Sequence, residues 1–259
     1  MGMKTKGYLA CVSVAVALGT FLAVTAPAAA ADSASEPAQP GQRIVMLIPG
    51  QQPSPGTSSL DQFDDMAAQL AGEGYVVHPV GVNGLDLIAD SSEIADAVDR
   101  ATAGVEVESL AIVAHSYGGL SSRSYLKTLG GSDIVDTYIA IGTPQYGSPG
   151  GCVQLPGFGF DGCPITPFIA DLNAGDDTPG DTGYVSIRSD EELADGRLDG
   201  GQCRLAPIKD LVHAVEPADA RVIDAVSGAL SGECAGEFVD EADGAITLDK
   251  TLFPAPTTG

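Results

Sequence analysis

The sequence has little positive charge, no tryptophan and only three histidines. Its 259 residues include 12 Lys and Arg against 35 Asp and Glu, a formal net charge of −23. A chain this acidic repels phosphate backbones, so nucleic acid is excluded as a partner. The chain also contains neither a Cys-x-x-Cys pair nor two closely spaced histidines. We therefore expect no metal centre.

Long apolar runs are scarce, and the longest uncharged one lies at the N-terminus, over 8–24. Lys4 and Lys6 precede it, and the small residues of 26–31 (APAAAA) follow it. This order predicts a secretory signal peptide over 1–30, with a retained signal anchor as the alternative. We expect a secreted, extracellular protein that has no stable membrane insertion after cleavage.

Four cysteines follow the signal segment, an even number that suits disulfide bonding outside the cell. They allow three pairings. Cys152 and Cys163 bracket a Gly/Pro-rich loop, which favours a bond between them and leaves Cys203 to pair with Cys234. Free buried thiols are the alternative.

Strand-like and helix-like segments alternate along one domain of about 190 residues, over 43–232. A Ser/Pro/Ala-rich lead-in over 31–42, expected to be disordered, precedes it, and a C-terminal tail over 233–259 follows. The alternation predicts an α/β fold with a mostly parallel central sheet and helices on both faces. Strands are expected at 43–48, 75–80, 109–114, 135–141 and 184–188, and helices at 60–71, 91–103, 117–129 and 217–230, the second opened by Asp90.

A sharp turn is expected where the third strand meets the third helix, at 114–119 (AHSYGG). Ser116 stands there with small residues, Ala114 and Gly118, two positions away on either side. Small residues at those positions let the chain turn tightly and lift the serine hydroxyl above the sheet, as in the nucleophile elbow of the α/β-hydrolase fold. An ordinary helix N-cap serine is the alternative, but it would not explain the glycines in the first helical turn.

The base that would activate Ser116 follows from chain order, which in this fold is serine, acid, then histidine. His78 precedes Ser116, and the turn points His115 away from it, so His213 is the candidate. The acid is expected just past the fifth strand, where Asp190 comes first; Glu191 is the second choice, followed by Asp195 and Asp199.

Two backbone N–H groups are expected to face the oxygen of a reacting carbonyl. One belongs to Tyr117, the residue after the candidate nucleophile. The other is assigned to Gln51, because Gly50 lets the backbone of that loop come close. An ordinary Gly/Pro turn is the alternative for this loop.

The stretch 142–183 is long, rich in Gly, Pro and Asp, and expected to cover the top of the sheet. Its apolar side chains are expected either to line an acyl site or to belong to the core: Leu155, Phe158, Phe160, Ile165, Phe168 and Ile169. Its acidic residues lack the spacing of a calcium-binding loop, which favours a solvated loop: Asp171, Asp176, Asp177 and Asp181.

Four segments resemble the secreted bacterial class 2 lipases, compact α/β-hydrolases of the actinobacterial and Bacillus lipase type. They are IPG, AHSYGG, IGTPQYGS and LNAGDDTPGDTGYVSIRSDEEL, and the resemblance runs from about residue 43 to 230. It implies hydrolysis of carboxylic esters of lipids without a cofactor. Carried over by motif, it implies a triad of Ser116, Asp190 and His213, with Gln51 and Tyr117 as oxyanion donors.

The sequence departs from the family in two places. Pro49-Gly50 stands where the family has His-Gly, and the loop that carries the acid is shortened. The same scaffold also serves thioesterases, acyltransferases and polyester hydrolases, and a non-catalytic secreted binding module is the alternative from another class. We expect a monomer whose partner is a lipid or other ester substrate.

Overall fold

The computed structural model describes residues 41–52, 59–192, 194, 196–244, 246 and 248–251. The expected signal peptide over 1–30 and almost all of the lead-in over 31–42 lie outside the described residues. No helix within the described ranges is long and apolar enough to cross a membrane.

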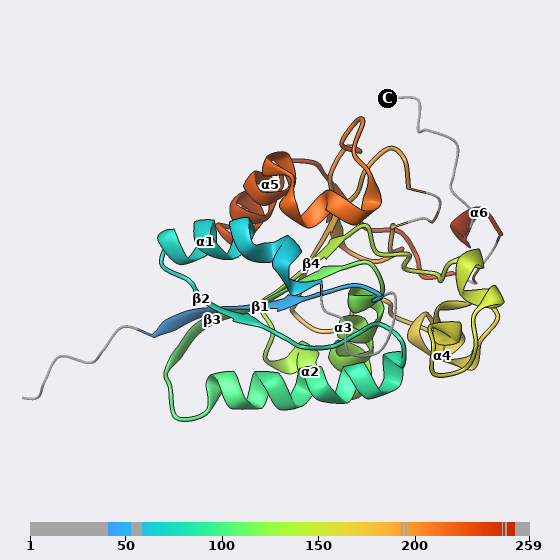
Figure 1. Cartoon of the computed structure of the whole chain (residues 1–259), viewed down its shortest axis with the longest axis horizontal. Helices are drawn as coiled ribbons and strands as arrows, with labels where there is room; N and C mark the ends of the chain where they lie inside the picture. The colour runs from blue at the N-terminus through green and yellow to red at the C-terminus, as the bar shows by residue number, and fades with distance from the viewer. Residues whose placement is uncertain are drawn as a thin grey trace, which may run out of the picture. The chain divides into compact units, whose positions relative to one another are not determined.

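A seven-stranded sheet of order β2-β1-β3-β4-β5-β6-β7 runs through the described chain (Figure 1). Neighbouring strands are parallel except for β6 and β7, which are antiparallel. The strands are β1 (Gln42–Ile48), β2 (Val76–Pro79), β3 (Val107–His115), β4 (Thr137–Ile141), β5 (Gly183–Ile187), β6 (Gln202–Arg204) and β7 (Glu237–Val239).

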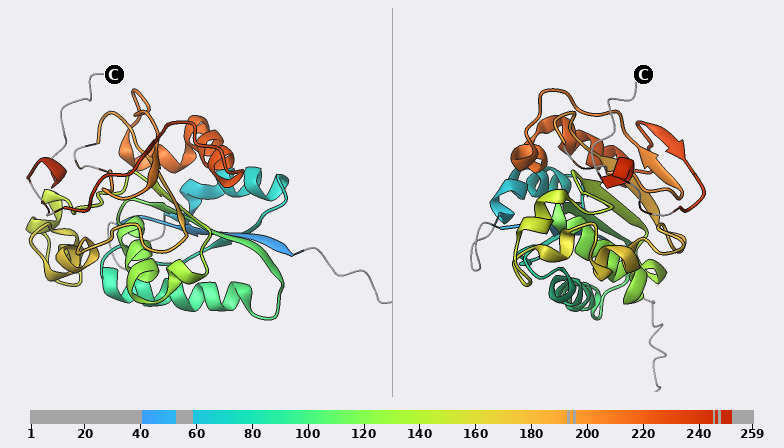
Figure 2. Two further views of the ribbon diagram at one scale, coloured as in Figure 1. Left: turned by 180° about the vertical axis from the view of Figure 1, so that it is seen from behind. Right: turned by 90° about the vertical axis from the view of Figure 1, so that its right-hand side faces the viewer.

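Helices cover both faces of this sheet, because its central strands are apolar on both sides. Along β1, Ile44 and Met46 pack with α2 (Leu87–Thr102) and α3 (Tyr117–Thr128) in one buried cluster. Val45 and Leu47 pack with α1 (Asp64–Gly72) and α5 (Ala220–Leu230) in a second. Figures 1 and 2 show the two helix pairs on opposite sides of the strands. The fold class predicted from the sequence is confirmed.

The second helix begins earlier than the sequence pattern predicts. Its N-cap is Asp86, whose carboxylate accepts the Ala89 N–H at 3.0 Å. Asp90, the expected cap, is buried inside the helix and accepts the Gly84 N–H at 2.6 Å. The Asp–Ser–Ser–Glu string therefore resembles a capping box by composition but lies one helical turn inside the helix.

The stretch 142–183 holds three short helices: the 3₁₀ turns η3 (Pro149–Val153) and η4 (Phe160–Gly162), and α4 (Pro167–Leu172). Cys152 and Cys163 form a disulfide bond that joins η3 to the end of η4. Cys203 and Cys234 form a second one, which joins β6 to the segment after α5. Both pairings are those favoured from the sequence.

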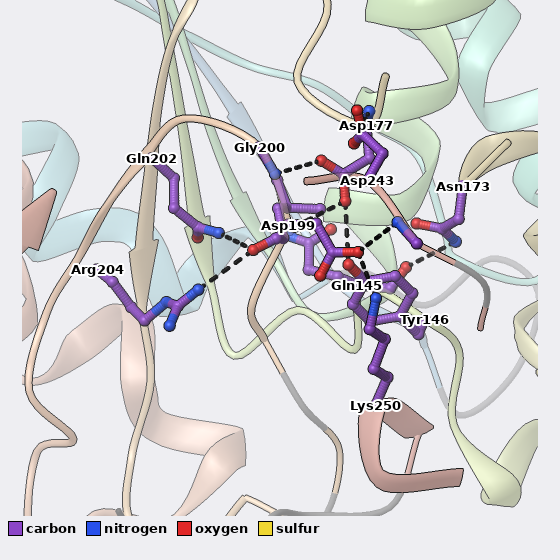
Figure 3. A network of polar contacts seen from close by, with 12 residues as sticks. Gln145, Tyr146, Asn173, Asp177, Asp199, Gly200, Gln202, Arg204, Asp243 and Lys250 are labelled. Carbon is purple, nitrogen blue, oxygen red and sulfur yellow. Dashed lines mark hydrogen bonds and ion pairs between the residues drawn. The ribbon is translucent and has the colours of Figure 1, made fainter. Parts of the chain in front are cut away.

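The residues after 232, predicted as a tail, extend the domain instead. Strand β7 pairs with β6 at the edge of the sheet. Further along, Lys250 in the short helix α6 (Leu248–Thr251) forms an ion pair with Asp199 (Figure 3). The domain therefore does not end at residue 232.

Asp177 is the centre of the polar network in Figure 3. Its buried carboxylate accepts hydrogen bonds from the Tyr146 hydroxyl at 3.0 Å and from the backbone N–H groups of Asp199 and Gly200 at 2.9 and 3.0 Å. This network connects the stretch 142–183 to the segment before β6, so Asp177 is not the solvated acid predicted from the sequence.

Arg123 on α3 is 2% exposed and holds the same stretch from the other side. Its guanidinium donates to the backbone oxygens of Gln145, Leu172 and Asp177 at 3.1, 3.3 and 3.2 Å, and to the Asn173 side chain at 3.1 Å. One buried cation thus satisfies several carbonyl oxygens that have no strand or helix partner.

We expect Arg123→Leu to lower the free energy of unfolding by about 3–5 kcal/mol, because it removes a buried cation that donates to three carbonyl oxygens and to the Asn173 side chain. In a domain of this size that loss lowers the melting temperature by roughly 10 °C, measurable by thermal denaturation. The control is Arg100→Leu, which removes an exposed ion pair with Glu93 and should change stability by less than about 1 kcal/mol. Equal melting temperatures for the two variants would contradict the role of Arg123.

Candidate active site

Ser116 lies on a strained turn between β3 and α3. Its φ of 53° is rare for a residue with a side chain. The turn is held by a hydrogen bond from the Ser116 N–H to the Ile141 carbonyl on β4 at 2.9 Å. Backbone strain of this kind persists only where the surroundings enforce it, and it gathers at functional sites.

Glycines on both sides leave the space that this turn needs. A Cβ at Gly50 would lie 2.7 Å from the Cβ of Ser116, and a Cβ at Gly118 would lie 2.3 Å from the Pro49 carbonyl oxygen. The loop after β1 therefore packs its backbone directly against the turn. This is the close approach inferred for Gly50 from the sequence.

His213 reaches Ser116 from 97 residues downstream. Its Nε2 lies 2.9 Å from the Ser116 Oγ. The residue opens the 3₁₀ turn η5 (His213–Ala218), which precedes α5, and its side chain is 42% exposed. The structure thus joins the serine and histidine that the sequence singled out, at a distance suited to proton transfer.

Two carboxylates face the other ring nitrogen of His213. Glu192 Oε1 lies 2.6 Å from Nδ1, and Glu216 Oε2 lies 3.1 Å from it. A carboxylate can only accept when ionised, so Nδ1 carries the hydrogen, and in the neutral ring Nε2 is free to accept from Ser116. Two carboxylates therefore lie where a catalytic histidine usually has one acid partner.

Asp190, the acid predicted from the sequence, is not at His213. Its Oδ1 accepts the backbone N–H of Asp210 at 3.0 Å. Asp210 has a φ of 54°, so the Asp190 carboxylate supports an unfavourable turn in the loop that leads to His213. The second choice, Glu191, is exposed, and its N–H donates to the Ser189 hydroxyl at 3.3 Å. The carboxylates that lie at Nδ1 are Glu192 and Glu216 instead.

Electrostatics around His213 follow from the two carboxylates. Burial disfavours the protonated ring, but Glu192 and Glu216 outweigh it and raise the pKa of His213 to about 10. Burial raises the pKa of Glu192. Burial also tends to raise the pKa of Glu216. Hydrogen bonds from His115 and His213 outweigh that effect and lower the Glu216 pKa to about 2. Glu216 is therefore the carboxylate that stays ionised.

The two predicted oxyanion donors lie beside the turn. Tyr117 follows Ser116 as the first residue of α3, where backbone N–H groups have no acceptor within the helix. Gln51 follows Gly50, and its side chain exchanges hydrogen bonds with Gln154 at 2.7 and 3.1 Å. That pair connects the loop after β1 to the disulfide-closed segment.

In the described part of the chain, two sets of side chains bring three potential metal ligands within 4.8 Å of one another: His115, His213 and Glu216, and Asp176, Asp177 and Asp243. In the first set, His115 and His213 share Glu216 as a hydrogen-bond acceptor. In the second, Asp177 accepts the donors shown in Figure 3. Hydrogen bonds explain why these side chains lie close together in both sets, so a bound metal ion is not needed to explain either.

Glu192 and Glu216 are the residues that sequence reasoning missed. Glu216 did leave a signal, because it lies three residues after His213, and that spacing brings side chains together in a helical turn. Glu192 left a weaker one, since it lies in the loop predicted to carry the acid.

Comparisons with known proteins identify the fold. No protein-family model matches the chain, and no curated protein matches it either. The lipase BlEst2 of Bacillus licheniformis in its propeptide form gives a TM-score of 0.61 at 17% identity, over 81% of this chain and 54% of that one. The lin2722 product of Listeria innocua gives 0.51 at 17% identity, over 78% and 99%.

This chain therefore has the α/β-hydrolase fold, and it spans about half the length of the Bacillus protein. Identities this low show the fold alone and do not distinguish the class 2 lipases from other hydrolases.

We expect Asp190→Asn to keep kcat for ester hydrolysis within about threefold of the unaltered protein, because its side chain contacts the Asp210 backbone and not the imidazole. Initial rates on a soluble p-nitrophenyl ester measure this. A decrease in kcat of a hundredfold or more would indicate that Asp190 is the acid partner of His213 after all.

Proposed function

We propose that this chain is a serine hydrolase that cleaves carboxylic esters of lipids through an acyl-enzyme intermediate. The observation that carries the proposal is the 2.9 Å approach of His213 Nε2 to Ser116 Oγ at a strained turn. A hydroxyl next to an imidazole, with a carboxylate behind the ring, is the arrangement that activates serine for attack on a carbonyl once the ring has lost its Nε2 proton.

In the first step, His213 Nε2 takes the proton of Ser116 as Oγ attacks the ester carbonyl carbon. The backbone N–H groups of Gln51 and Tyr117 stabilise the negative charge on the carbonyl oxygen. The bond to the alcohol breaks, and His213 gives its proton to the departing oxygen. Water then attacks the acyl-enzyme, gives a proton to His213 and releases the fatty acid, and the proton returns to Ser116.

Exposed apolar side chains near the site support a lipid substrate. Val153, Leu155 and Ile165 are 87%, 68% and 83% exposed, and all belong to the segment around the Cys152–Cys163 bond. That segment reaches the site directly, because Gly162 packs against the Tyr117 ring. Of the residues expected to line an acyl site, Ile169 belongs to the core instead.

The two disulfide bonds are compatible with the proposed secretion.

The alternative functions on this scaffold are thioesterase, acyltransferase and polyester hydrolase activities, which also pass through an acyl-enzyme. Comparing the rates on different substrates distinguishes them from lipid-ester hydrolysis. A non-catalytic binding module would have no reason to keep the strain at Ser116.

The central test is Ser116→Ala, which removes the nucleophile. We expect a loss of kcat on p-nitrophenyl butyrate on the order of a thousandfold or more. A fluorophosphonate probe should label the unaltered protein at Ser116 and leave the variant unlabelled. An unlabelled native protein would contradict the proposal and favour the binding module.

The lipid preference is tested by Val153→Ser combined with Ile165→Ser. We expect hydrolysis of emulsified long-chain triglyceride to fall on the order of tenfold, since two apolar side chains no longer meet the lipid. Activity on soluble p-nitrophenyl butyrate should stay unchanged. The control is Ile134→Ser, which removes an exposed apolar side chain from the turn between α3 and β4. Equal losses in both assays would contradict a role in lipid contact.

A further inference from the structure

A catalytic imidazole of this kind needs one carboxylate behind it, and His213 has two. Its Nδ1–H can donate fully to one acceptor at a time, yet Glu192 and Glu216 lie 2.6 and 3.1 Å from that nitrogen. They come from different elements, the loop after β5 and the turn η5, so the fold brings two independent acids to one atom.

The backbone at the end of β4 makes room for both acids. Gly142 has a φ of +55°, and a Cβ there would lie 2.1 Å from Glu216 Oε2 and 2.9 Å from both Glu192 Oε1 and His213 Nδ1. Any other residue at this position would displace the carboxylates from the ring. Gly142 thus leaves a space that two carboxylates and one imidazole fill together.

Glu216 is fully buried and is fixed by partners other than His213. Its Oε1 accepts the Ser189 backbone N–H at 3.0 Å. Its Oε2 lies 3.5 Å from Nε2 of His115, a ring that packs at a tilt against His213 with centroids 4.6 Å apart. The same His115 nitrogen lies 3.1 Å from the His213 carbonyl oxygen, so it carries the hydrogen. Glu216 therefore positions the catalytic histidine through several contacts.

We propose that Glu216 is a second acid partner of His213, a positioning residue that works with Glu192 so that either carboxylate can take the Nδ1–H when the other is lost. The inference rests on the proposed hydrolase function, since it assigns a role in activating Ser116.

The charges of Glu192 and Glu216 should change the pH at which His213 loses its proton, an effect that a purely structural role would not have. Among the residues that the structure describes, the titratable groups that contact His213 are Glu192, Glu216 and His115, and burial keeps His115 neutral by lowering its pKa. Two carboxylates facing one ring favour its protonated form, so the free base appears only as pH rises. Since the groups interact strongly, the acidic limb of the pH profile belongs to the cluster as a whole.

The first test compares Glu192→Gln, Glu216→Gln and the double variant on p-nitrophenyl butyrate. We expect each single variant to lose about tenfold to a hundredfold in kcat, because one carboxylate remains at Nδ1. The double variant should lose on the order of 10⁴-fold, the effect of leaving a catalytic histidine without an ionised acid. The control is Glu191→Gln, an exposed glutamate in the same loop, which should match the unaltered protein.

The second test measures charge. In the unaltered protein kcat/KM should rise from neutral into alkaline pH, because the raised pKa keeps His213 protonated at lower pH. Removing one carboxylate charge lowers that pKa, so Glu216→Gln should move the acidic limb at least one pH unit lower. The imidazole resonances of His213, followed by NMR in a Ser116→Ala background, report the same shift without any substrate.

Two outcomes would overturn the inference. One is a Glu192→Gln enzyme as inactive as the double variant beside a Glu216→Gln enzyme with native kcat and pH profile. The other does not need Glu216→Gln to fold. A His213 pKa at or below 6.5 in Glu192→Gln would show that the Glu216 carboxylate does not raise the pKa of the imidazole. If the native protein cleaves no ester but the NMR shift appears, the proposed function fails and the acid pair stands.

Discussion

The close packing of the loop after β1 against the Ser116 turn is the constraint on which the site depends. Gly50 and Gly118 allow backbone to meet backbone at distances that no side chain would permit. That contact keeps Ser116 in a conformation that an isolated chain would avoid. The strain costs on the order of 1–3 kcal/mol, which the two buried clusters on either side of the sheet must offset.

Parallel strands explain why distant residues meet here. The carboxyl ends of β1, β3, β4 and β5 lie at one edge of the sheet, and each is followed by part of the site: Gly50, Ser116, Gly142 and Glu192. Ligand sites in open α/β sheets form at this edge for the same reason. His213 completes the set because Ser189, just past β5, donates to Glu216 in the turn that carries the histidine.

The sequence predicted which serine and histidine lie together, because residue type and spacing leave one solution there. Small residues around Ser116 are required by the turn, and three histidines with a fixed chain order leave only His213. Sequence reasoning was wrong where geometry depends on tertiary contacts. Asp190 and Glu192 differ by two positions in a loop with no periodicity, and the Asp210 N–H decides which way Asp190 points. The three-residue strands β6 and β7 are too short to show alternation, so β6 was not predicted and β7 was taken for part of a tail.

Two buried acids behind one base are costly unless the fold supplies donors for them. Glu216 receives the Ser189 N–H and lies beside His115, so it has donors in addition to the His213 imidazole. Glu192 lacks that degree of burial, with 10% of its side chain exposed against none for Glu216. The short 2.6 Å contact therefore comes from the acid whose pKa is raised, and the lasting charge comes from the one whose pKa is lowered. The two carboxylates behind His213 thus differ in environment, and the shorter contact and the more stable charge come from different residues.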